Sequence, residues 1–258
     1  MKSQSTTLLV IGGGPGGYVA AIRAAQLGLK TALVEKGPKP EWGGTCLHWG
    51  CIPTKALLHD AYLYDQVQHA GRYGVDVEGV KLNLPNVMKH KETVVRKLAL
   101  GIEGLLKKNK VSQIVGFGKI VKPGVVDVDG RQVTVKNIIL ATGSVPKWFP
   151  GMEPDGKGII TSNEALSLKE IPKSMVVIGA GAVGLEFASV YLRFGSKVGV
   201  VEAMPQILPV EDEEAAVETQ KILTRRGMKF FVGAKVESIK GSYEIGRASC
   251  RERVYVLV

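Results

Sequence analysis

Two cysteines that could carry electrons stand close together in this chain. Cys46 and Cys51 are two of only three cysteines, and residues 43 to 55 around them read GGTCLHWGCIPTK. In a chain with few cysteines, a close pair favours a redox role over a structural disulfide framework. Pro53 suits the first turn of a helix, which would place Cys51 at a helix N-terminus, where a thiolate is stabilised. The chemistry that these residues predict is thiol–disulfide exchange.

The spacing of the two cysteines restricts the backbone between them. Five residues of an ideal helix rise about 7.5 Å, whereas bonded cysteines have Cα atoms roughly 4.4–6.8 Å apart. If Cys46 and Cys51 are bonded, a compact non-helical or distorted turn must join them, and Gly50 would help it form. A metal half-site and two inert core cysteines stay open as alternatives. For His48 a local hydrogen bond is favoured over acid–base catalysis, and for Trp49 packing is favoured over a substrate platform.

A glycine-rich turn precedes the cysteine stretch and is typical of dinucleotide-binding folds. It follows an apolar run at residues 8–11 and opens a helix-compatible segment at 18–27, and the next strand pattern ends at Glu35, 18 residues after the last motif glycine. This context predicts a pyrophosphate on the helix N-terminus and ribose hydroxyls hydrogen-bonded to Glu35. The three glycines, which allow the tight turn, the close backbone approach and the helix–strand packing, are Gly12, Gly14 and Gly17.

The same pattern recurs 167 residues later, with strand signals at 175–178 and a helix at 185–194. Its acidic residue, Glu202, again stands 18 residues after the last glycine, and no arginine follows closely. A carboxylate there favours NAD over NADP, because it would repel a 2′-phosphate. Glu186 is expected in the first turn of this helix, either favoured there by the dipole or facing a functional partner. The motif glycines are Gly179, Gly181 and Gly184.

The remaining patterns complete an α/β fold with two Rossmann-like dinucleotide-binding domains. Residues 84–110 predict a long amphipathic helix, and Asp129-Gly130 predicts a hairpin that forms a small antiparallel β-meander in the first domain. A separate strand at 138–140 ends in Ala141-Thr142-Gly143, whose small residues permit close approach to a cofactor. The elements expected after the second glycine turn are a helix at 212–226 and strands at 230–232 and 236–239.

Composition limits the classes of protein considered. The 258 residues are 45% apolar and carry a formal net charge of +10. That length suffices for about two domains. The lysines are scattered and no aromatic residues are interleaved with them, so a solvated basic surface is favoured over nucleic-acid binding. No apolar run reaches the length of a membrane span or a signal peptide. We therefore expect no membrane partner, no metal site and a cytoplasmic location.

Taken together, these residues resemble the pyridine nucleotide–disulfide oxidoreductases, most closely the dihydrolipoamide dehydrogenase branch. The match runs from about residue 8 to about residue 240, and its specific motif is GGTCLxxGCIPxK. The resemblance implies FAD in the first domain and NAD in the second. It implies that Cys51 faces the flavin as a thiolate while Cys46 exchanges with dihydrolipoamide, and that Lys55 approaches the flavin and pairs with Glu186. The other residues that it assigns to cofactors are Gly44, Thr45, Gly116, Ala141, Thr142 and Gly143 for FAD, and the second-domain glycines, Glu202 and Val236 for NAD.

Departures from the family motif are mild. His48 stands where asparagine is usual and Thr54 where serine is usual. The implied partner is dihydrolipoamide on a lipoyl-bearing protein of a 2-oxo acid dehydrogenase or glycine-cleavage complex, and the implied assembly is a homodimer. The alternatives are an NADP-linked disulfide reductase, a mercuric reductase, or a non-catalytic nucleotide-binding module that senses redox state through the two cysteines.

The family implied by the resemblance is nearly twice as long as this chain. The C-terminal domain of that family carries a His–Glu acid–base pair. No histidine of this chain stands at a matching position; the four are His48, His59, His69 and His90. We therefore expect no dihydrolipoamide turnover by this chain alone. The expected domains are residues 1–147 for FAD and 148–243 for NAD, with a Pro- and Gly-rich boundary at 146–158.

Residues 244–258 are expected to be a non-native tail, because EIGRASCRERV resembles a translated sequencing adapter. On this hypothesis Cys250 has no function.

Overall fold

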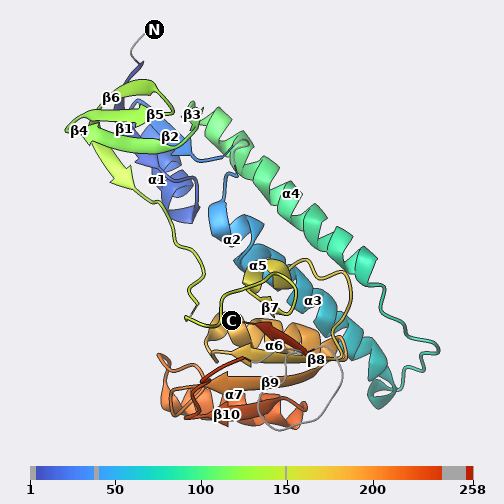
Figure 1. Cartoon of the computed structure of the whole chain (residues 1–258). Coiled ribbons are helices and arrows are strands. Elements are labelled where there is room, and N and C mark those ends of the chain that lie inside the picture. Colours follow the sequence, from blue (N-terminus) through green and yellow to red (C-terminus); the bar gives the residue numbers. More distant parts are fainter. Residues whose placement is uncertain (1–3, 38–40, 149, 240–253, 258) are drawn as a thin grey trace. The chain divides into compact units, whose positions relative to one another are not determined.

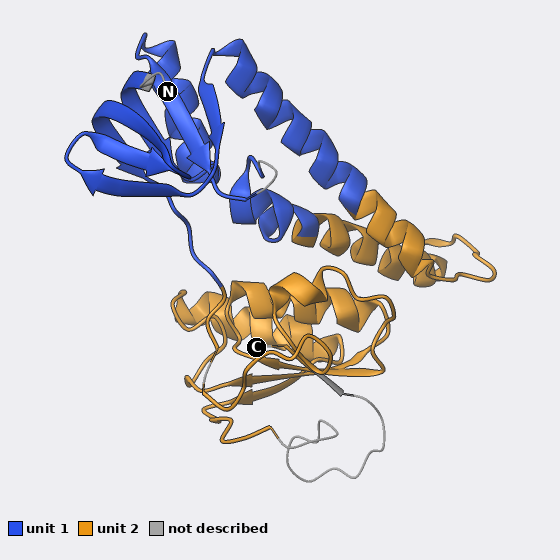
Figure 2. Ribbon diagram, turned by 45° about the horizontal axis from the view of Figure 1, so that its top comes forward, with its two compact units in different colours: residues 1–53, 92–145 blue, residues 54–91, 146–258 orange. Residues whose placement is uncertain are grey.

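The chain folds into two compact units, each built on its own sheet (Figure 2). The computed structural model describes residues 4–37, 41–148, 150–239 and 254–257. Unit 1 comprises residues 1–53 and 92–145, and unit 2 comprises residues 54–91 and 146–258. This division places residues 54–91 in unit 2, whereas the boundaries expected from the sequence assign them to the first domain; those boundaries stay a prediction.

Unit 1 contains a six-stranded sheet in the order β3-β2-β1-β6-β5-β4 (Figure 1). Strands β3, β2, β1 and β6 pair in parallel, and β4, β5 and β6 pair antiparallel. This mixed sheet confirms the Rossmann-like unit with a small antiparallel meander. The strands are β1 (Gln4–Ile11), β2 (Thr31–Glu35), β3 (Ser112–Val115), β4 (Gly118–Lys122), β5 (Val125–Val128) and β6 (Arg131–Leu140).

The helices attached to this sheet include the crossover α1 (Pro15–Gln26) and the short α2 (Gly44–His48). The two long helices, α3 (Cys51–Gln68) and α4 (Leu84–Lys108), each contribute residues to both units. Central strands β1 and β2 read as continuous apolar runs because helices cover one of their faces and the meander the other. Val10 and Leu33 pack toward α1 and α4, whereas Leu9 and Val34 pack toward the meander.

The hairpin at Asp129-Gly130 is confirmed, but the strand after it is longer than predicted. Asp129 and Gly130 have φ of 48° and 83°, the two positive values that a two-residue hairpin turn of type I′ needs. Residues 138–140 form a strand as expected, but they are not a separate one, because they are the end of β6, a ten-residue strand that begins at Arg131. Its first part closes the meander against β5, and it runs on in parallel beside β1.

Unit 2 contains a five-stranded sheet in the order β10-β9-β8-β11-β7, with every neighbouring pair parallel. This second Rossmann-like sheet confirms the internal repeat. The strands are β7 (Ile159–Ile160), β8 (Ser174–Ile178), β9 (Lys197–Glu202), β10 (Lys229–Val232) and β11 (Val254–Leu257), and the further helices are α5 (Ser162–Ala165), α6 (Ala182–Arg193), α7 (Glu213–Arg225) and the 3₁₀ helix η1 (Ala70–Tyr73).

The end of the chain departs from the predicted pattern. The expected helix at 212–226 is confirmed as α7 and the strand at 230–232 as β10, but the strand at 236–239 is wrong, since residues 234–239 adopt no regular secondary structure. The chain turns at Gly233, with φ of 66°, and the Ala234 N–H donates to the Glu202 carbonyl at 3.0 Å. Residues 240–253, most of the expected non-native tail, lie outside the described residues. Its last part forms β11, and the foreign origin of the tail stays a prediction.

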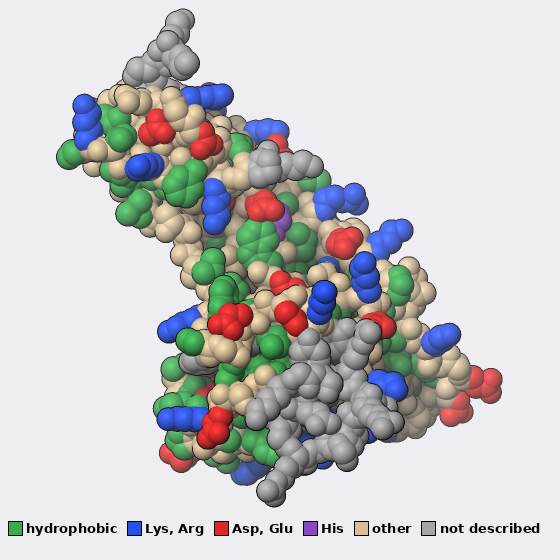
Figure 3. All heavy atoms as spheres, viewed as in Figure 1, with side chains coloured by type: hydrophobic (Ala, Val, Ile, Leu, Met, Phe, Trp, Pro, Cys, Tyr) green, Lys and Arg blue, Asp and Glu red, His purple; other side chains and the backbone are tan. Residues whose placement is uncertain are grey.

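The surface agrees with the dispersed charge expected from the sequence. On the face shown in Figure 3, Lys and Arg side chains are distributed among acidic ones rather than gathered into a stripe. Hydrophobic side chains also reach the surface of unit 1, among them Ile120, Val121 and Leu140 at 45%, 53% and 64% exposure. Across the described ranges, no helix combines the length and apolarity that a bilayer span requires.

A capping box fixes the start of α5 and provides a stability prediction. The Thr161 hydroxyl accepts from the Asn163 N–H at 3.2 Å, while Glu164 accepts from the Thr161 N–H at 2.7 Å and from its hydroxyl at 2.6 Å. Burial raises the pKa of Glu164, but the hydrogen bonds from Thr161 outweigh this, so the pKa lies below its ordinary value. Thr161→Ala is therefore expected to lower the free energy of unfolding by about 1 kcal/mol at neutral pH.

The effect should depend on pH with a definite sign. Because folding lowers the pKa of Glu164, its ionised form contributes stability above the ordinary glutamate pKa of about 4.3, and this is lost as the pH falls through the lowered value. Urea unfolding of the wild type and of Thr161→Ala between neutral and acidic pH should show their difference shrinking. Glu170→Gln, which removes an exposed carboxylate, serves as control. A difference that grows toward acidic pH would contradict the assignment.

Candidate functional site

The two cysteines lie on either side of a break between two helices. Cys46 is half-buried within α2, and Cys51 is exposed at the first position of α3, as the sequence predicts. Trp49 and Gly50 separate the helices, so the connection is the distorted turn that the spacing requires. A Cβ at Gly50 would lie 2.8 Å from the Thr45 carbonyl oxygen, so only glycine lets the chain fold back there. The disulfide between them stays a prediction.

The cysteine segment is built directly onto the first glycine turn. The Gly43 N–H donates to the Gly13 carbonyl at 2.8 Å. A Cβ on Gly44 would lie 2.7 Å from the Gly14 Cα, and Gly43 and Gly44 have φ of 108° and 54°. Glycines on both segments thus let two backbones approach each other closely. A nucleotide held by this turn would have the segment carrying Cys46 as its immediate neighbour.

The first glycine turn has the shape that a pyrophosphate requires. Gly12 follows β1 with φ of 109°, and a Cβ there would overlap the Ala141 carbonyl oxygen. A Cβ on Gly17 would overlap the Gly12 carbonyl oxygen, so this glycine permits the packing of α1 on the strand end. Gly14 caps α1 with no side-chain hydrogen bond, Pro15 has no N–H, and the Gly17 N–H donates to the Gly14 carbonyl at 2.9 Å, which leaves the Gly16 N–H and the helix dipole to an anion. These residues fit the phosphates of a dinucleotide.

Glu35 closes the turn from the neighbouring strand. Its carboxylate accepts a short hydrogen bond from the Gly13 N–H. Its own carbonyl accepts from the Gly116 N–H at 2.8 Å, so the end of β3 is tied to the same edge. The Ala141 N–H donates to the Ile11 carbonyl at 2.8 Å, and Thr142 and Gly143 follow β6 at this edge. Four of the FAD residues inferred from the resemblance therefore lie with Glu35 at the carboxyl ends of parallel strands, where open α/β sheets bind ligands: Gly116, Ala141, Thr142 and Gly143.

Trp42 is a site residue that the sequence analysis missed. It is buried at 3% exposure, and a Cβ on Gly13 would lie 2.8 Å from its ring. Its carbonyl lies 3.1 Å from Nε2 of His48, so His48 makes the local hydrogen bond favoured from the sequence. The Trp42 Nε1 is buried and has no partner among the described residues. The sequence feature that could have identified Trp42 is its position directly before Gly43 and Gly44.

The second glycine turn repeats this geometry in unit 2. Gly179 follows β8 with φ of 101°, and a Cβ on Gly184 would overlap its carbonyl oxygen. Gly181 caps α6 without a side-chain hydrogen bond. Glu202 is buried at 8% exposure, and its carboxylate accepts from the Ala180 N–H at 2.7 Å and from the Met204 N–H at 2.8 Å.

The structure also places Val236, which was assigned to the NAD site by resemblance. It is half-buried in the irregular segment that follows β10, the strand next to β9. Its role in nucleotide binding stays a prediction.

Lys55 and Glu186 form an ion pair within unit 2. The Lys55 ammonium donates a short hydrogen bond to the Glu186 carboxylate, although 131 residues separate them in sequence. The expectation that Glu186 lies in the first turn of its helix is wrong, since α6 begins at Ala182 and has no acidic residue in that turn. For Glu186, the sequence left open a favourable interaction with the helix dipole or a functional side-chain partner. The structure favours the side-chain partner, which is Lys55.

The remaining histidines are not part of this arrangement. His90 Nδ1 lies 2.9 Å from an Asp60 carboxylate oxygen, and His69 Nδ1 lies 2.8 Å from the Asp65 carbonyl oxygen and 3.4 Å from the Asp65 carboxylate. His59 is exposed on α3. Within the described part of the chain, no cluster of three or more His, Cys, Asp or Glu side chains could hold a metal ion.

Comparison with known proteins extends these observations to nearly the whole chain. The chain is 46% identical over 242 residues to dihydrolipoyl dehydrogenase of Bacillus subtilis, covering 89% of this chain and 50% of that protein. It is 48% identical over 246 residues to mitochondrial dihydrolipoyl dehydrogenase 2 of Arabidopsis thaliana, covering 93% and 48%. It is also 48% identical to leghemoglobin reductase of Glycine max, covering 93% and 47%. The chain thus spans about half the length of the curated relatives it matches.

Solved structures give the same result for the fold. LpdA from Mycobacterium tuberculosis superposes with a TM-score of 0.81 at 28% identity, covering 92% of this chain and 54% of that one. The HOCl-induced flavoprotein disulfide reductase RclA from Escherichia coli gives a TM-score of 0.78 at 28% identity, covering 97% and 55%. The family model for pyridine nucleotide-disulphide oxidoreductases matches residues 6–253. With its paired glycine turns and the GGTCLxxGCIPxK segment, this chain belongs to the pyridine nucleotide-disulphide oxidoreductase family.

Proposed function

We propose that this chain is the nucleotide-binding part of an NAD-dependent dihydrolipoyl dehydrogenase. Membership of the family implies FAD as cofactor. The observation that carries the proposal is the packing of the cysteine segment on the first glycine turn through Gly43 and Gly44. That packing would bring a redox dithiol next to a bound dinucleotide. The names and the 46–48% identity of the relatives favour this function over the alternatives.

The residues that would hold FAD are those of the unit 1 turn. The N-terminus of α1 would bind the pyrophosphate, and Glu35 would accept hydrogen bonds from a ribose. Bound FAD supplies a two-electron acceptor between the protein thiols and a nicotinamide. The short Lys55–Glu186 contact would hold the lysine in a fixed direction while keeping its charge.

The chemistry of the chain's own residues is thiol–disulfide exchange. A thiolate of dihydrolipoamide would attack the Cys46 sulfur of a Cys46–Cys51 disulfide, forming a mixed disulfide and releasing Cys51 as a thiolate. The second substrate thiolate would then attack the substrate sulfur of the mixed disulfide, closing lipoamide and releasing the Cys46 thiolate. The substrate loses two electrons and the cysteine pair gains them. The two substrate protons pass to a base, expected from the sequence to lie in a further domain.

The N-terminus of α3 explains why the cysteines would divide these roles. Cys51 is the first residue of an 18-residue helix, where the dipole and free N–H groups stabilise a thiolate. Cys46 lies within the five-residue α2 and lacks that position. Cys51 is therefore the better leaving group, and attack is directed to Cys46.

The partner and assembly follow from the same proposal. The substrate would be dihydrolipoamide on a lipoyl-bearing protein of a 2-oxo acid dehydrogenase or glycine-cleavage complex, and the complete protein would be a homodimer. The relatives that carry the name dihydrolipoyl dehydrogenase support this proposal. The cytoplasmic location stays a prediction from the sequence.

The proposal is tested with the full-length protein that contains this chain. Loaded with FAD, it should oxidise dihydrolipoamide and reduce NAD+, and two-electron reduction should produce a long-wavelength absorption band from a thiolate beside the flavin. Turnover only with NADPH and another disulfide would instead favour an NADP-linked reductase. Reversible oxidation of Cys46 and Cys51 without turnover of any of these substrates would favour a redox sensor.

Glu202 carries a prediction about nucleotide choice. The full-length protein should use NADH in preference to NADPH, because the carboxylate repels a 2′-phosphate. Glu202→Gln removes the charge and keeps one oxygen for the backbone N–H groups, so it should narrow the preference by roughly tenfold. The kcat/KM ratio for the two nucleotides measures this, with Glu211→Gln as control. An unchanged ratio in Glu202→Gln would show that another group selects the nucleotide.

A further inference from the structure

A cavity of about 360 Å³ lies in unit 2 among the C-terminal ends of its helices. It is lined from the end of α3, from η1, from the end of α6 and from the end of α7. Its volume falls within the range of small-ligand sites, roughly 300–1,000 Å³. The charged and titratable residues that line it are Asp65, His69, Arg72, Arg193, Arg225 and Arg226.

Arg193 is the most constrained of the four arginines. It is the last residue of α6, half-buried, and its Nη1 makes a short hydrogen bond to the Ser189 hydroxyl. Its Nε is buried and has no partner in the described ranges. Burial and the neighbouring Arg226 lower the pKa of the Arg193 guanidinium, while Asp65 and Tyr62 act in the opposite direction. Charges of like sign are therefore gathered here at a cost that bound anions would offset.

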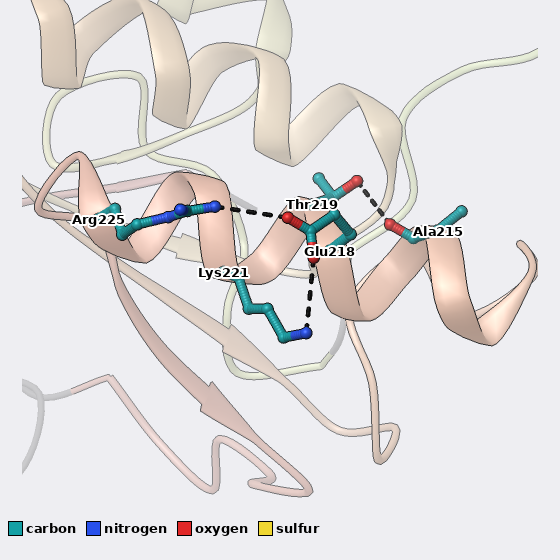
Figure 4. Close-up of polar contacts among 5 residues, drawn as sticks. All are labelled: Ala215, Glu218, Thr219, Lys221 and Arg225. Atoms are coloured by element: carbon teal, nitrogen blue, oxygen red, sulfur yellow. Dashed lines mark hydrogen bonds and ion pairs between the residues drawn. The ribbon is translucent and has the colours of Figure 1, made fainter.

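The other three arginines are oriented but poorly neutralised. Arg225 Nη2 lies 3.4 Å from Glu218, an exposed carboxylate that also lies 3.5 Å from the Lys221 ammonium (Figure 4). Arg72 Nε donates to the His69 carbonyl at 3.2 Å, a neutral partner. For Arg226 the described residues provide no side-chain hydrogen bond or ion pair. Asp65 is the one carboxylate among the described residues lining the cavity.

Helix capping explains only part of this arrangement. Arg193 and Arg225 each end a helix, where a positive charge complements the dipole. That role would be met by arginines pointing into solvent at separate places. It does not require four of them around one cavity, nor a buried Nε–H left unpaired, which is rare in folded proteins.

The cavity is separate from the dinucleotide site of the same unit. The glycine turn at 179–184 follows β8 at the carboxyl edge of the sheet, and α6 runs back from it toward the start of β9. The C-terminal end of α6 therefore lies at the amino edge. A ligand in the cavity would leave the glycine turn accessible.

We propose that this cavity binds a small polyanion with two or more phosphoryl groups. Guanidinium groups bind phosphate oxygens through paired N–H donors, and such charge-assisted bonds are about twice as strong as neutral ones. Four arginines from three helical segments could surround a diphosphate, and the unpaired Nε–H of Arg193 would gain an acceptor. Free pyrophosphate and a nucleoside diphosphate share this chemistry.

Titration calorimetry of the full-length, FAD-loaded protein that contains this chain, with inorganic pyrophosphate as ligand, tests the proposal. Saturable binding is expected, with a component that Arg226→Gln, which breaks no described side-chain bond, should weaken about tenfold or more. Lys221→Gln removes a charge from the same helix outside the cavity and should change the affinity by less than about twofold. Arg193→Lys keeps the charge but loses the planar guanidinium with its paired N–H donors. It should weaken binding even where circular dichroism shows an unchanged fold.

The outcomes separate this cavity from the glycine turns. Equal affinity in the wild type and Arg226→Gln would place the anion elsewhere and overturn the proposal, as would the absence of saturable binding to the wild type. ADP distinguishes the source of the phosphoryl groups. Binding of ADP that weakens in Arg226→Gln and is tighter than that of pyrophosphate would assign the site to a nucleotide, and the reverse order would assign it to a free phosphate compound.

Discussion

Replacing Cys51 by serine is expected to abolish reduction of the full-length, FAD-loaded protein by dihydrolipoamide. Cys51 is the exposed first residue of α3, the helix N-terminal position proposed above for the sulfur that leaves as a thiolate. A serine alkoxide is not stable at neutral pH and forms no disulfide. We expect a loss of at least about 10³-fold in kcat/KM, as when a reacting group is removed. The long-wavelength band should disappear with it, although FAD stays bound.

Cys46→Ser separates the two roles. This variant should be equally inactive with dihydrolipoamide, because the sulfur that receives the attack is gone. It should nevertheless keep the long-wavelength band, since the Cys51 thiolate remains. Retention of the band in Cys51→Ser and its loss in Cys46→Ser would reverse the assignment of the two sulfurs.

Replacing Gly17 by alanine is expected to disrupt unit 1. A Cβ there would overlap the carbonyl oxygen of Gly12, a backbone atom that cannot rotate away. Relief would require α1 to move off the end of β1, which separates the buried Ala21 and Ala24 from the core. We expect a loss of about 3 kcal/mol or more in the free energy of unfolding. Urea unfolding and the fraction of FAD retained after gel filtration measure the two consequences.

Gly16→Ala is the matched control for this variant. It lies one residue earlier in the same helix, and its Cβ would meet its nearest neighbour, the Ala141 side chain, at 3.8 Å. This is ordinary van der Waals contact, and alanine favours a helix over glycine by up to about 1 kcal/mol. Gly16→Ala should therefore be neutral or slightly stabilising. Equal stability of the two alanine variants would mean that the tight approach at Gly17 does not limit the fold.

Local chemistry is what made much of this chain predictable. Gly12 and Gly179 take positive φ that other residues rarely adopt, so their patterns identify turns without knowledge of the rest of the chain. The Asp129-Gly130 pair sets its hairpin in the same way. Glu35 and Glu202 stand at the ends of strands whose distance from the turn is limited by one crossover helix. In each case the interacting groups lie within about 25 residues.

The errors arose where a partner is distant in sequence. Whether β6 is one strand or two depends on its pairing with β1, which supplies backbone partners as far as Leu140. The alternation of apolar residues at 236–239 predicts a strand. It does not show whether a neighbouring strand is present for that segment to pair with. The place of Glu186 in α6 depended on where that helix begins, and its partner Lys55 comes from a helix 131 residues earlier.

The sequence by itself determined the family, the two glycine turns and the pair of cysteines, because each depends on residue types at short fixed spacings. Only the tertiary structure decided three further features: the seating of the cysteine segment on the Gly13–Gly14 backbone, the burial of Trp42 against that turn, and the gathering of four arginines around one cavity. Each joins backbones or side chains brought together by the packing of helices and strands. The close backbone approach of the cysteine segment to the glycine turn is therefore a property of the folded unit, although every glycine that permits it can be read from the sequence.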